Sequence, residues 1–552
     1  MKHPNDGATR RELLGATLVL TSADAQAVNG LVSRNDRAIE RTLELQIADP
    51  ANPDRGGIPG AFGLALPNGT AMALMDYAAG LLHQQSKFYG SSLVAQRIRL
   101  GIEQLRRVQN DDGFVDLLIS NFDSPPDTAF VTSNLATAGL LLRRAGQREL
   151  FSTFEPFLRK AAAGLTVGGV HTPNHRWVVC SALAQLYELF GESGYLRRID
   201  EWLAEGIDID EDGQYTERST VTYNGVTNRA LTIAALKLKR PELLAPVRRN
   251  LDAMLHLLHS NLDVTTEVSR RQDKYTRGDM KSHWMAVRHL AIADQNGQLA
   301  TLARHLDANY ANLALMMEYP ELSRPLPAAE PLPDSYERLF PHVGVVRYRS
   351  GKTSATFLSD NDVLFSLHHG DAAITSVAFA AAWFGLAHFR GKKLEKAERG
   401  YQTAQSLDWG YWQPFMPVRK IPAGVWDEVR PLRRRTNECF LQQSAAIERT
   451  SAGFRLRIRS GGTEPVPVTI RIGVPHEAAV EGCSAAPEGA KGLFLKSGYA
   501  TITQGRNRIR VGPGSFRHWC TSPVKLPAAV TDFAIYITGT TPFDHVVDFE
   551  TS

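Results

Sequence analysis

Two hydrophobic periodicities divide this chain. From about residue 33 to 320, apolar residues recur every three or four positions, the spacing that gathers them on one face of an α-helix. Beyond about residue 344, apolar and polar residues alternate, as they do in a strand with one buried face. The sequence therefore predicts helices followed by antiparallel strands, an α+β multidomain fold.

Short helical segments separated by turn signals make up the first part. Asp-Gly turns follow two of them, at 112–113 and 212–213. The stretch 109–116 recurs in altered form as 210–217, which indicates a repeated hairpin of helices. A repeated hairpin predicts a ring or open array in which each pair is buried against its neighbours. The clearest predicted helices are 72–83, 94–108, 132–144, 174–190, 228–238, 247–258 and 283–293.

A proline-rich stretch separates the two parts. Four prolines fall within 324–333, which is typical of a semi-rigid linker. After it, strands alternate with Gly, Pro, Asn and Asp turns, and we expect them to form stacked sheets. The predicted strands are 345–349, 354–358, 363–368, 445–449, 454–458, 466–473, 500–503, 508–511 and 533–538.

Composition is that of a globular protein and adds few constraints. The 552 residues are 43% hydrophobic and 22% charged, and the net charge of +4 is too small to indicate a nucleic-acid partner. Arginine clusters at 270–271 and 433–435 suit carboxylate or sulfate ligands, or they belong to a solvated charged face. The four cysteines are too few and too scattered for a disulfide framework or a zinc motif. We expect Cys180 to be buried, and a bridge among Cys439, Cys483 and Cys520 stays open.

The first 27 residues are predicted to be an export signal. Arg10 and Arg11 resemble the twin-arginine motif, and a short apolar run extends to Leu20. The small residues Ala25 and Ala27 suit a cleavage site, and the run is too short to span a membrane. We therefore expect periplasmic or secreted protein that starts near Val28.

A first group of chemistry-bearing side chains stands at the start of predicted helix 174–190. Thr172 and Pro173 are typical of a helix N-cap and first position, so Asn174 and His175 fall in the first turn. There they would face the mouth of a helical ring. Alternatively, Asn174 only caps the helix and His175 is a surface residue, or His171 and His175 are part of a metal site.

A second group lies at 212–225. Tyr215 and Tyr223 flank a polar stretch without a helical period, which predicts a loop or hairpin, although either tyrosine could be a core residue instead. Together the two groups hold amide, imidazole, guanidinium and phenol side chains. These are the groups needed to remove a proton beside a carboxylate and to return one to a leaving oxygen.

The two segments resemble those of polysaccharide lyases with an (α/α) toroid followed by β-sandwich domains, such as chondroitin AC, hyaluronate, xanthan and heparinase-like lyases. In that family an Asn-Trp-Trp segment opens a helix, and a later Asp-Gly-Ser-Phe segment carries a histidine and then a tyrosine. By this resemblance the asparagine corresponds to Asn174 and the tyrosine to Tyr223. The histidine position falls near Arg218, which is a departure from the family. An arginine-rich family segment corresponds loosely to 269–278.

The resemblance implies a fold and an activity. We expect a toroid at 28–323, a linker at 324–343 and antiparallel β-sandwich domains at 344–552. The implied activity is β-elimination in a polysaccharide that contains a uronate, with D-glucuronate favoured because the histidine is missing, and the product carries a 4,5-unsaturated uronate. The implied partner is an acidic polysaccharide or oligosaccharide, with no cofactor, no nucleic acid and no membrane.

The chemistry of such a lyase assigns roles to individual residues. A C5 proton becomes acidic only when the neighbouring carboxylate charge is neutralised. Asn174 can donate to that carboxylate, and Arg271 or Arg277 can add a cation. Tyrosine is protonated near neutral pH, so Tyr223 needs a nearby cation to act as a base, and Arg218 is the candidate.

The identity of the base has two solutions. Tyr223 acts alone as base and then as acid on one face of the sugar, with His175 as a positioning donor, or His171 or His175 is the base and the elimination is anti. The further candidates for substrate binding are Tyr215, Tyr275, Phe122 and Trp177.

Several other interpretations stay open. Strand-end residues His369 and Asp371, with His388, are candidates for a structural zinc or calcium site, or they are solvated. Phe122 could stack on a sugar, or lie in an exposed loop. An (α/α)-barrel glycoside hydrolase would need paired carboxylates, and a non-catalytic glycan-binding protein would need only aromatic residues along a groove. The candidate carboxylates are Asp116, Asp210, Asp212 and Glu217.

Overall fold

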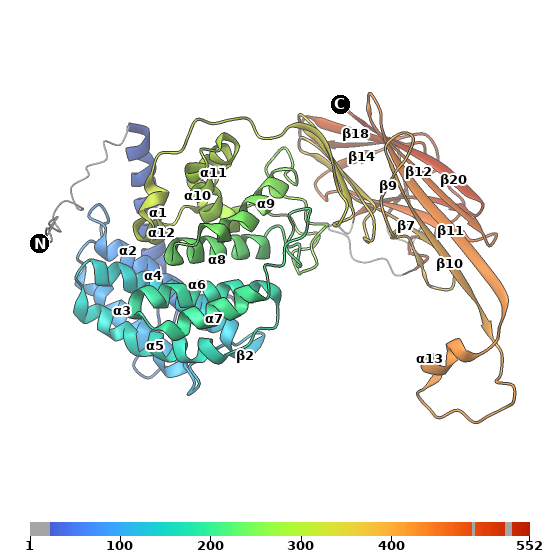
Figure 1. Cartoon of the computed structure of the whole chain (residues 1–552). Coiled ribbons are helices and arrows are strands. Elements are labelled where there is room, and N and C mark those ends of the chain that lie inside the picture. The colour runs from blue at the N-terminus through green and yellow to red at the C-terminus, as the bar shows by residue number, and fades with distance from the viewer. Residues whose placement is uncertain (1–21, 488–491, 525–532) are drawn as a thin grey trace, which may run out of the picture. The chain divides into compact units, whose positions relative to one another are not determined.

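The computed structural model describes residues 22–487, 492–524 and 533–552. The chain forms two compact units (Figure 1). The helical unit comprises the chain up to Gly206 with Arg229–Leu243 and Trp284–Glu330, and the sheet unit comprises Ile207–Asn228, Leu244–His283 and Pro331–Ser552. The twin-arginine motif predicted at the N-terminus lies outside the described residues.

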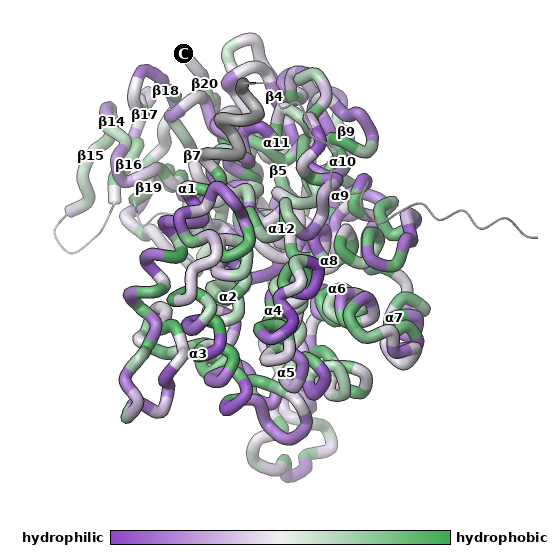
Figure 2. Tube along the Cα trace, turned by 90° about the vertical axis from the view of Figure 1, so that its left-hand side faces the viewer, coloured by the Kyte–Doolittle hydropathy of each residue, from purple (hydrophilic) through white to green (hydrophobic). Residues whose placement is uncertain are grey.

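Helices of two kinds alternate along the helical unit. Helices α2, α4 and α6 pack against one another and are buried around most of their circumference, whereas α3, α5 and α7 bury one face against them. Figure 2 shows the mixture of hydrophilic and hydrophobic residues along α3 and α5. A helix that is apolar all round belongs inside, and an amphipathic one outside, so the sequence itself sets the two layers.

The bounds of the helices follow the predicted pattern closely at several ends. Serine side chains cap α3 and α4, and proline occupies the first turn of α2, α4 and α6. None of the described helices has the length and apolarity needed to cross a membrane. The helices are α1 Ser22–Leu45, α2 Pro67–Leu82, α3 Ser92–Val108, α4 Pro125–Arg144, α5 Arg148–Val167, α6 Pro173–Phe190, α7 Ser193–Ala204, α8 Tyr223–Leu238, α9 Leu244–Leu255, α10 Trp284–Ala293, α11 Gly297–Tyr310 and α12 Leu313–Glu318.

Two large sheets of mainly antiparallel strands form the body of the sheet unit. One has the order β14-β17-β18-β20-β12-β11-β10-β9 and the other β15-β16-β19-β13-β7-β6-β5-β4-β3, with β8 beside β7. Alternate residues of both sheets meet in one core, where, for example, the rings of Phe365 and Phe549 lie 5.0 Å apart. The helical first part and antiparallel second part confirm the predicted fold class.

The strands account for most of the chain after residue 334. Strand β3 lies inside the stretch predicted as linker, so the irregular backbone there comprises 324–334 and the turn after Phe340. The strands of these sheets are β3 Ser335–Phe340, β4 Val345–Ser350, β5 Thr353–Leu358, β6 Phe365–His369, β7 Ala372–Ala381, β8 Ala387–His388, β9 Glu395–Lys396, β10 Tyr401–Trp412, β11 Arg435–Arg449, β12 Gly453–Gly462, β13 Pro467–Gly473, β14 Ala479–Glu481, β15 Ser484–Ala485, β16 Leu493–Phe494, β17 Ala500–Gln504, β18 Asn507–Gly512, β19 Ala534–Thr540 and β20 Phe543–Thr551.

Two loops between helices belong to the sheet unit. Arg347 of β4, fully buried, donates to the carbonyl oxygen of Leu258 at 3.0 Å and to Thr356, and Tyr336 donates to the carbonyl oxygen of His256 at 2.8 Å. These bonds attach the loop after α9 to the edge strands β3–β5. The loop that precedes Tyr223 and the first residues of α8 belong to the same unit.

The cysteines are free. Cys180 is buried in α6 as predicted, and burial raises the pKa of its thiol to about 12. The bridge left open among Cys439, Cys483 and Cys520 is not formed.

Candidate active site

Asn174 and His175 stand in the first turn of α6, as the Thr-Pro signal predicts. The Thr172 hydroxyl does not cap a helix N–H but bonds to both side chains, at 3.2 Å from Asn174 Nδ2 and 2.9 Å from His175 Nδ1. The exposed fractions are 2% for Asn174 and 8% for His175, so the interpretation of His175 as a surface residue is wrong. The ring of the exposed His171 meets the His175 ring edge-on at 4.8 Å.

Two predicted substrate-binding aromatics are core residues. Trp177 of α6 is fully buried, with the Arg176 guanidinium over its ring at 4.6 Å. Tyr215 is 3% exposed and donates to Asn228 Oδ1 at 2.8 Å, and burial raises the pKa of its phenol well above the usual value. Neither ring has a free face for a sugar, so both assignments are wrong, and the core alternative holds for Tyr215.

Tyr223, the first residue of α8, is the partly exposed phenol of the sheet unit's candidate site. The prediction of a loop is wrong from this residue on. Gln272 Nε2 donates to the Tyr223 hydroxyl at 2.6 Å, and the Arg271 guanidinium lies 5.0 Å from the centre of its ring. Arg271 in turn pairs with the buried Glu217, with 3.3 Å between Nε and Oε1. Tyr223 is thus held between an amide donor and a cation.

A buried carboxylate fixes the two chain segments that carry this group. Asp273 accepts from the Ser219 hydroxyl at 2.8 Å, from the Val221 N–H at 3.2 Å and from the Ser269 hydroxyl. The Ser219 oxygen also accepts from the N–H of Tyr223 at 2.9 Å, at the start of α8. The backbone that carries Tyr223 is therefore tied to the backbone that carries Arg271 and Gln272.

Arg218 is not the cation beside Tyr223. Its backbone has a φ of +50°, and its guanidinium donates to the carbonyl oxygens of His342 at 2.7 Å and Val343 at 3.2 Å. The left-handed turn directs the side chain to the β3–β4 connection, and the guanidinium over the Tyr223 ring is that of Arg271. Likewise Glu217 pairs with Arg271 and not with the adjacent Arg218.

Arg277 and Tyr275 lie on the same loop but have other partners. Arg277 is largely exposed and pairs with Asp263, with 2.6 Å between Nε and Oδ2. The Tyr275 hydroxyl donates to Asn361 Oδ1 at 3.0 Å, and burial raises its pKa. Phe122 on the short strand β2 Asn121–Ser124, in the helical unit, is 66% exposed, which fits either a sugar platform or an exposed loop. The substrate-binding roles of these three residues stay predictions.

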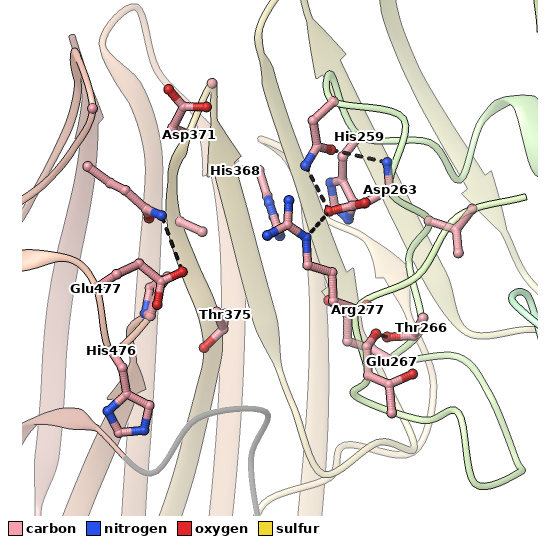
Figure 3. A pocket seen from close by; sticks show the side chains of 18 residues that line it. His259, Asp263, Thr266, Glu267, Arg277, His368, Asp371, Thr375, His476 and Glu477 are labelled. Carbon is pink, nitrogen blue, oxygen red and sulfur yellow. Dashed lines mark hydrogen bonds and ion pairs between the residues drawn. The ribbon is translucent and has the colours of Figure 1, made fainter. Parts of the chain in front are cut away.

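A pocket of about 490 Å³ lies within the sheet unit, between the loop after α9 and the ends of several strands (Figure 3). Its size is typical of a small-molecule site. Arg277 and Asp263 line one side, and His476 and Glu477 line the other. The mixture of imidazole, carboxylate, amide and guanidinium groups suits a ligand with many hydroxyls.

Two stacked imidazoles form part of this wall. The rings of His259 and His368 lie 3.8 Å apart, and the Ser354 hydroxyl bonds to His259 Nδ1 at 2.8 Å. Burial lowers the pKa of His368 to about 3 and that of His259 well below its usual value, so both rings are neutral near pH 7. No local pattern marks this pair in the sequence, because 109 positions separate the two residues.

The metal candidates do not converge. His369 Nδ1 bonds to the Thr353 hydroxyl at 2.7 Å, His388 Nε2 to the Asp362 carbonyl oxygen at 3.1 Å, and Asp371 accepts from Asn507 at 3.5 Å. Across the described ranges, no three His, Cys, Asp or Glu side chains are grouped as metal ligands. The zinc or calcium site proposed for these residues, and the His171–His175 pair, therefore lack the geometry of a metal centre.

The carboxylates that a hydrolase would require are also engaged. Asp212 accepts from the Val343 N–H at 2.8 Å, Asp210 from the Gln214 N–H at 2.8 Å, and Asp116 from the Asp123 N–H at 2.7 Å. Burial raises the pKa of Asp212. Each of these carboxylates therefore has a structural partner: Asp210 stabilises the Asp-Gly turn, and Asp212 bonds to the connection between β3 and β4.

Solved structures share this architecture. A Streptomyces coelicolor A3 chondroitin AC lyase in complex with chondroitin sulphate matches with a TM-score of 0.54 and 12% identity, over 96% of this chain and 80% of that chain. A Paenibacillus xanthan lyase matches with 0.54 and 10%, over 96% of this chain and 56% of that chain. Heparinase III matches with 0.52 and 11%, over 100% and 94%. This chain has the fold of these polysaccharide lyases.

The resemblance seen in the motifs is thus confirmed at the level of the fold. No family model matches the sequence, and no curated protein does. At identities of 10–12% the likeness carries the architecture and not the individual site residues.

A buried histidine near the Tyr223 loop predicts a pH-dependent stability. His283, fully buried, donates from Nε2 to the Thr220 carbonyl oxygen at 3.0 Å and accepts from Asn228 at 3.1 Å, and burial lowers its pKa to about 4. The unfolded chain, with a histidine pKa of about 6.5, binds this proton more readily, so stability falls as pH drops from 6.5 towards 4. The loss from this group is about 2 kcal/mol at pH 5.

Urea unfolding at pH 7.5 and pH 5 measures this effect. We expect the difference in the free energy of unfolding between the two pH values to shrink by about 2 kcal/mol in His283→Gln. It should persist in His305→Gln, which changes an exposed histidine of α11. Equal pH dependence in both variants would contradict the assignment.

Proposed function

We propose that this protein is a polysaccharide lyase that cleaves a uronate-containing polysaccharide, with D-glucuronate as the favoured uronate, by β-elimination. The observation that carries the proposal is the Tyr223 hydroxyl held between the Gln272 amide and the Arg271 guanidinium, in a chain with the lyase fold. Such a phenol can take the C5 proton of a uronate.

The proposed reaction needs one base, one acid and charge neutralisation. The Tyr223 oxygen removes the C5 proton, the C–H electron pair forms the C4–C5 double bond, and the C4–O4 bond breaks. The same phenol then returns the proton to O4, which is a syn elimination. We propose that Asn174 donates to the uronate carboxylate and that His175 positions it, roles that stay predictions from the sequence.

Arg271 gives a prediction of its own. In Arg271→Met the cation is lost while the side chain still covers the Tyr223 ring, so we expect kcat to fall about 100-fold, the cost of losing one preorganised charge. Arg218→Met, whose guanidinium bonds to backbone carbonyls, is the matched control and should keep kcat within a few-fold. Initial rates of both variants measure kcat. A larger loss of kcat in Arg218→Met than in Arg271→Met would restore Arg218 as the cation that assists Tyr223.

Ultraviolet absorbance separates lyase from hydrolase and from binding protein. The protein is incubated with a panel of uronate polymers, including chondroitin sulphate and xanthan, and absorbance is recorded with reducing ends. A lyase produces the conjugated unsaturated uronate together with new ends, a hydrolase produces ends alone, and a binding protein produces neither. New ends without absorbance on every polymer would overturn the proposal.

Export by the twin-arginine route is part of the same proposal. The support is the Arg10–Arg11 pair followed by a short apolar run and small residues. Replacing both arginines by lysine should keep the protein in the cytoplasm, as measured by fractionation of the expressing cells. Unchanged export of that variant would contradict export by the twin-arginine route.

A further inference from the structure

Strands β10 and β11 extend beyond their sheet as a two-stranded ribbon. Neighbour β12 pairs with β11 only from Leu441 onward, and β9 pairs with β10 only near Tyr401. From Trp409 to Phe440 the chain therefore has no third strand, and the tip holds the short helix α13 Trp426–Val429 (Figure 1). We call residues 409–440 the arm. Trp409 and Cys439 at the base of the arm pack against the sheet core, and the Phe384 ring lies 6.0 Å from that of Tyr411. Beyond this base, a two-stranded ribbon is only marginally stable in water.

The arm exposes large apolar side chains in an unusual concentration. The exposed fractions are highest at the tip, where Met416 is 85% and Val418 78% exposed. Monomeric proteins rarely present such a run of apolar surface unless a ligand or partner covers it. The exposed apolar side chains of the arm are Tyr411, Met416, Val418, Trp426, Leu432 and Phe440.

Guanidinium groups lie over the aromatic rings of the arm. Arg433 lies 4.5 Å from the ring centres of both Phe415 and Trp426. Arg430 lies 5.1 Å from those of both Trp409 and Trp412. Stacking holds each guanidinium plane in place while its edge can donate paired hydrogen bonds to a carboxylate or sulfate.

The tip of the arm is also strongly basic for its length. Residues 413–434 carry five cations against two carboxylates, a net charge of +3, while the whole chain carries +4. The carboxylates are Asp427 and Glu428, and Asp427 pairs with Arg430 at 3.3 Å. The cations are Arg419, Lys420, Arg430, Arg433 and Arg434.

We propose that the arm is a second binding site for an acidic polysaccharide, an inference that rests on the proposed function. Aromatic faces contact the C–H faces of sugar rings, and arginine edges bind the acidic groups of the same chain, so the arm offers both contacts. A second copy of this protein is disfavoured as the occupant, because two arms would bring like charges of +3 together. An anionic polymer instead neutralises that charge.

The test measures binding and turnover separately. The probe is chondroitin sulphate, with neutral dextran as the comparison polymer, and binding is measured by calorimetry in a Tyr223→Phe background that prevents cleavage. The arm variant is Arg433→Ser with Arg434→Ser. Its matched control is Arg455→Ser with Arg457→Ser, which removes the same charge from the exposed face of β12. Thermal unfolding verifies that each variant folds.

We expect the arm variant to bind chondroitin sulphate about tenfold more weakly, the cost of removing arginine contacts at a binding hot spot, while the control and dextran binding are unchanged. With the Tyr223 residue intact, KM for the polymer should rise while kcat and the KM for a tetrasaccharide stay constant. Added salt should weaken wild-type binding more than that of the arm variant.

The failure of the arm proposal and the failure of the lyase proposal give different results in this test. Unchanged polymer affinity in the arm variant overturns the arm proposal, even if unsaturated products form. A dimer in sedimentation that the arm variant converts to monomers, with polymer binding intact, identifies a second copy as the occupant and also overturns it. If the arm variant binds the polymer more weakly but the wild type forms no unsaturated product from any polymer, the arm proposal is supported and the lyase proposal is contradicted.

Discussion

Tyr223→Phe is expected to lower kcat at least about 1,000-fold on the polymer that the wild type cleaves. The variant keeps the ring under Arg271 and removes only the oxygen that accepts from Gln272. Since the proposed reaction uses that oxygen both to take and to return the proton, its loss removes base and acid together, for which factors of about 100 to 10,000 are typical. Initial rates of absorbance increase provide the measurement.

The control for this variant is the same chemical change elsewhere. Tyr89→Phe removes an exposed hydroxyl from the helical unit and should leave kcat unchanged. The thermal unfolding midpoint of Tyr223→Phe should match that of the wild type, because the hydrogen bond from Gln272 that the variant loses is exposed to solvent. Near-normal turnover by Tyr223→Phe, with the loss found instead in His175→Ala, would make the histidine the base and the elimination anti.

Asn174→Ala is expected to lower kcat by about 100- to 1,000-fold, the range found when one donor to a developing anion is removed. The Asn174 amide donates to the Thr172 hydroxyl at 3.2 Å, which fixes its orientation, and the expected loss follows from its proposed role as the donor to the uronate carboxylate. Because the charge grows as the C5 proton leaves, kcat should fall more than KM rises. Steady-state kinetics of the variant measures both.

Asn134→Ala is the comparison for this change. Asn134 is a buried asparagine of α4 whose amide donates to Asn68 at 3.0 Å, and it has no assigned role in the chemistry. Its loss should lower stability and leave kcat within about threefold, as for a buried hydrogen bond that takes no part in the reaction. A turnover defect shared equally by Asn134→Ala and Asn174→Ala would mean that Asn174 acts through the fold alone.

The sequence predicts the fold because each layer depends on local periodicity. Helices such as α3 and strands such as β12 bury residues at their own period, and Thr172 and Pro173 mark the start of α6 to within one residue. The same signals place Asn174 and His175 correctly in a first turn. The periods and the helix start depend only on residues that are close together in the sequence.

The partner of Tyr223 depends on tertiary contacts that spacing does not encode. Arg218 is five positions away but turns to the β3–β4 connection through a positive φ, whereas Arg271 is 48 positions away and lies over the ring. The buried Asp273, which ties the two loops, explains the difference. The available signal in the sequence is the stretch 269–273, which holds two arginines and one acidic residue.

Aromatic residues were the least predictable part of the site. Trp177 and Tyr215 belong to polar stretches, yet both are buried, because a single large ring can fill the core from any segment that passes over it. The arm shows the converse. Its arginine cluster at 433–435 is apparent in the sequence. Its exposed aromatic surface is not, because it arises where β10 and β11 extend beyond the ends of the adjacent strands.

Mass spectrometry of the products formed in water enriched in oxygen-18 tests the elimination mechanism most directly. In β-elimination the two product masses sum to that of the substrate, and no labelled oxygen enters, because the bond breaks without addition of water. We predict this result for a uronate oligosaccharide that the protein cleaves, with the unsaturated uronate on one fragment. Products heavier by one water, with label at the new reducing end, would identify a hydrolase and contradict the proposed elimination.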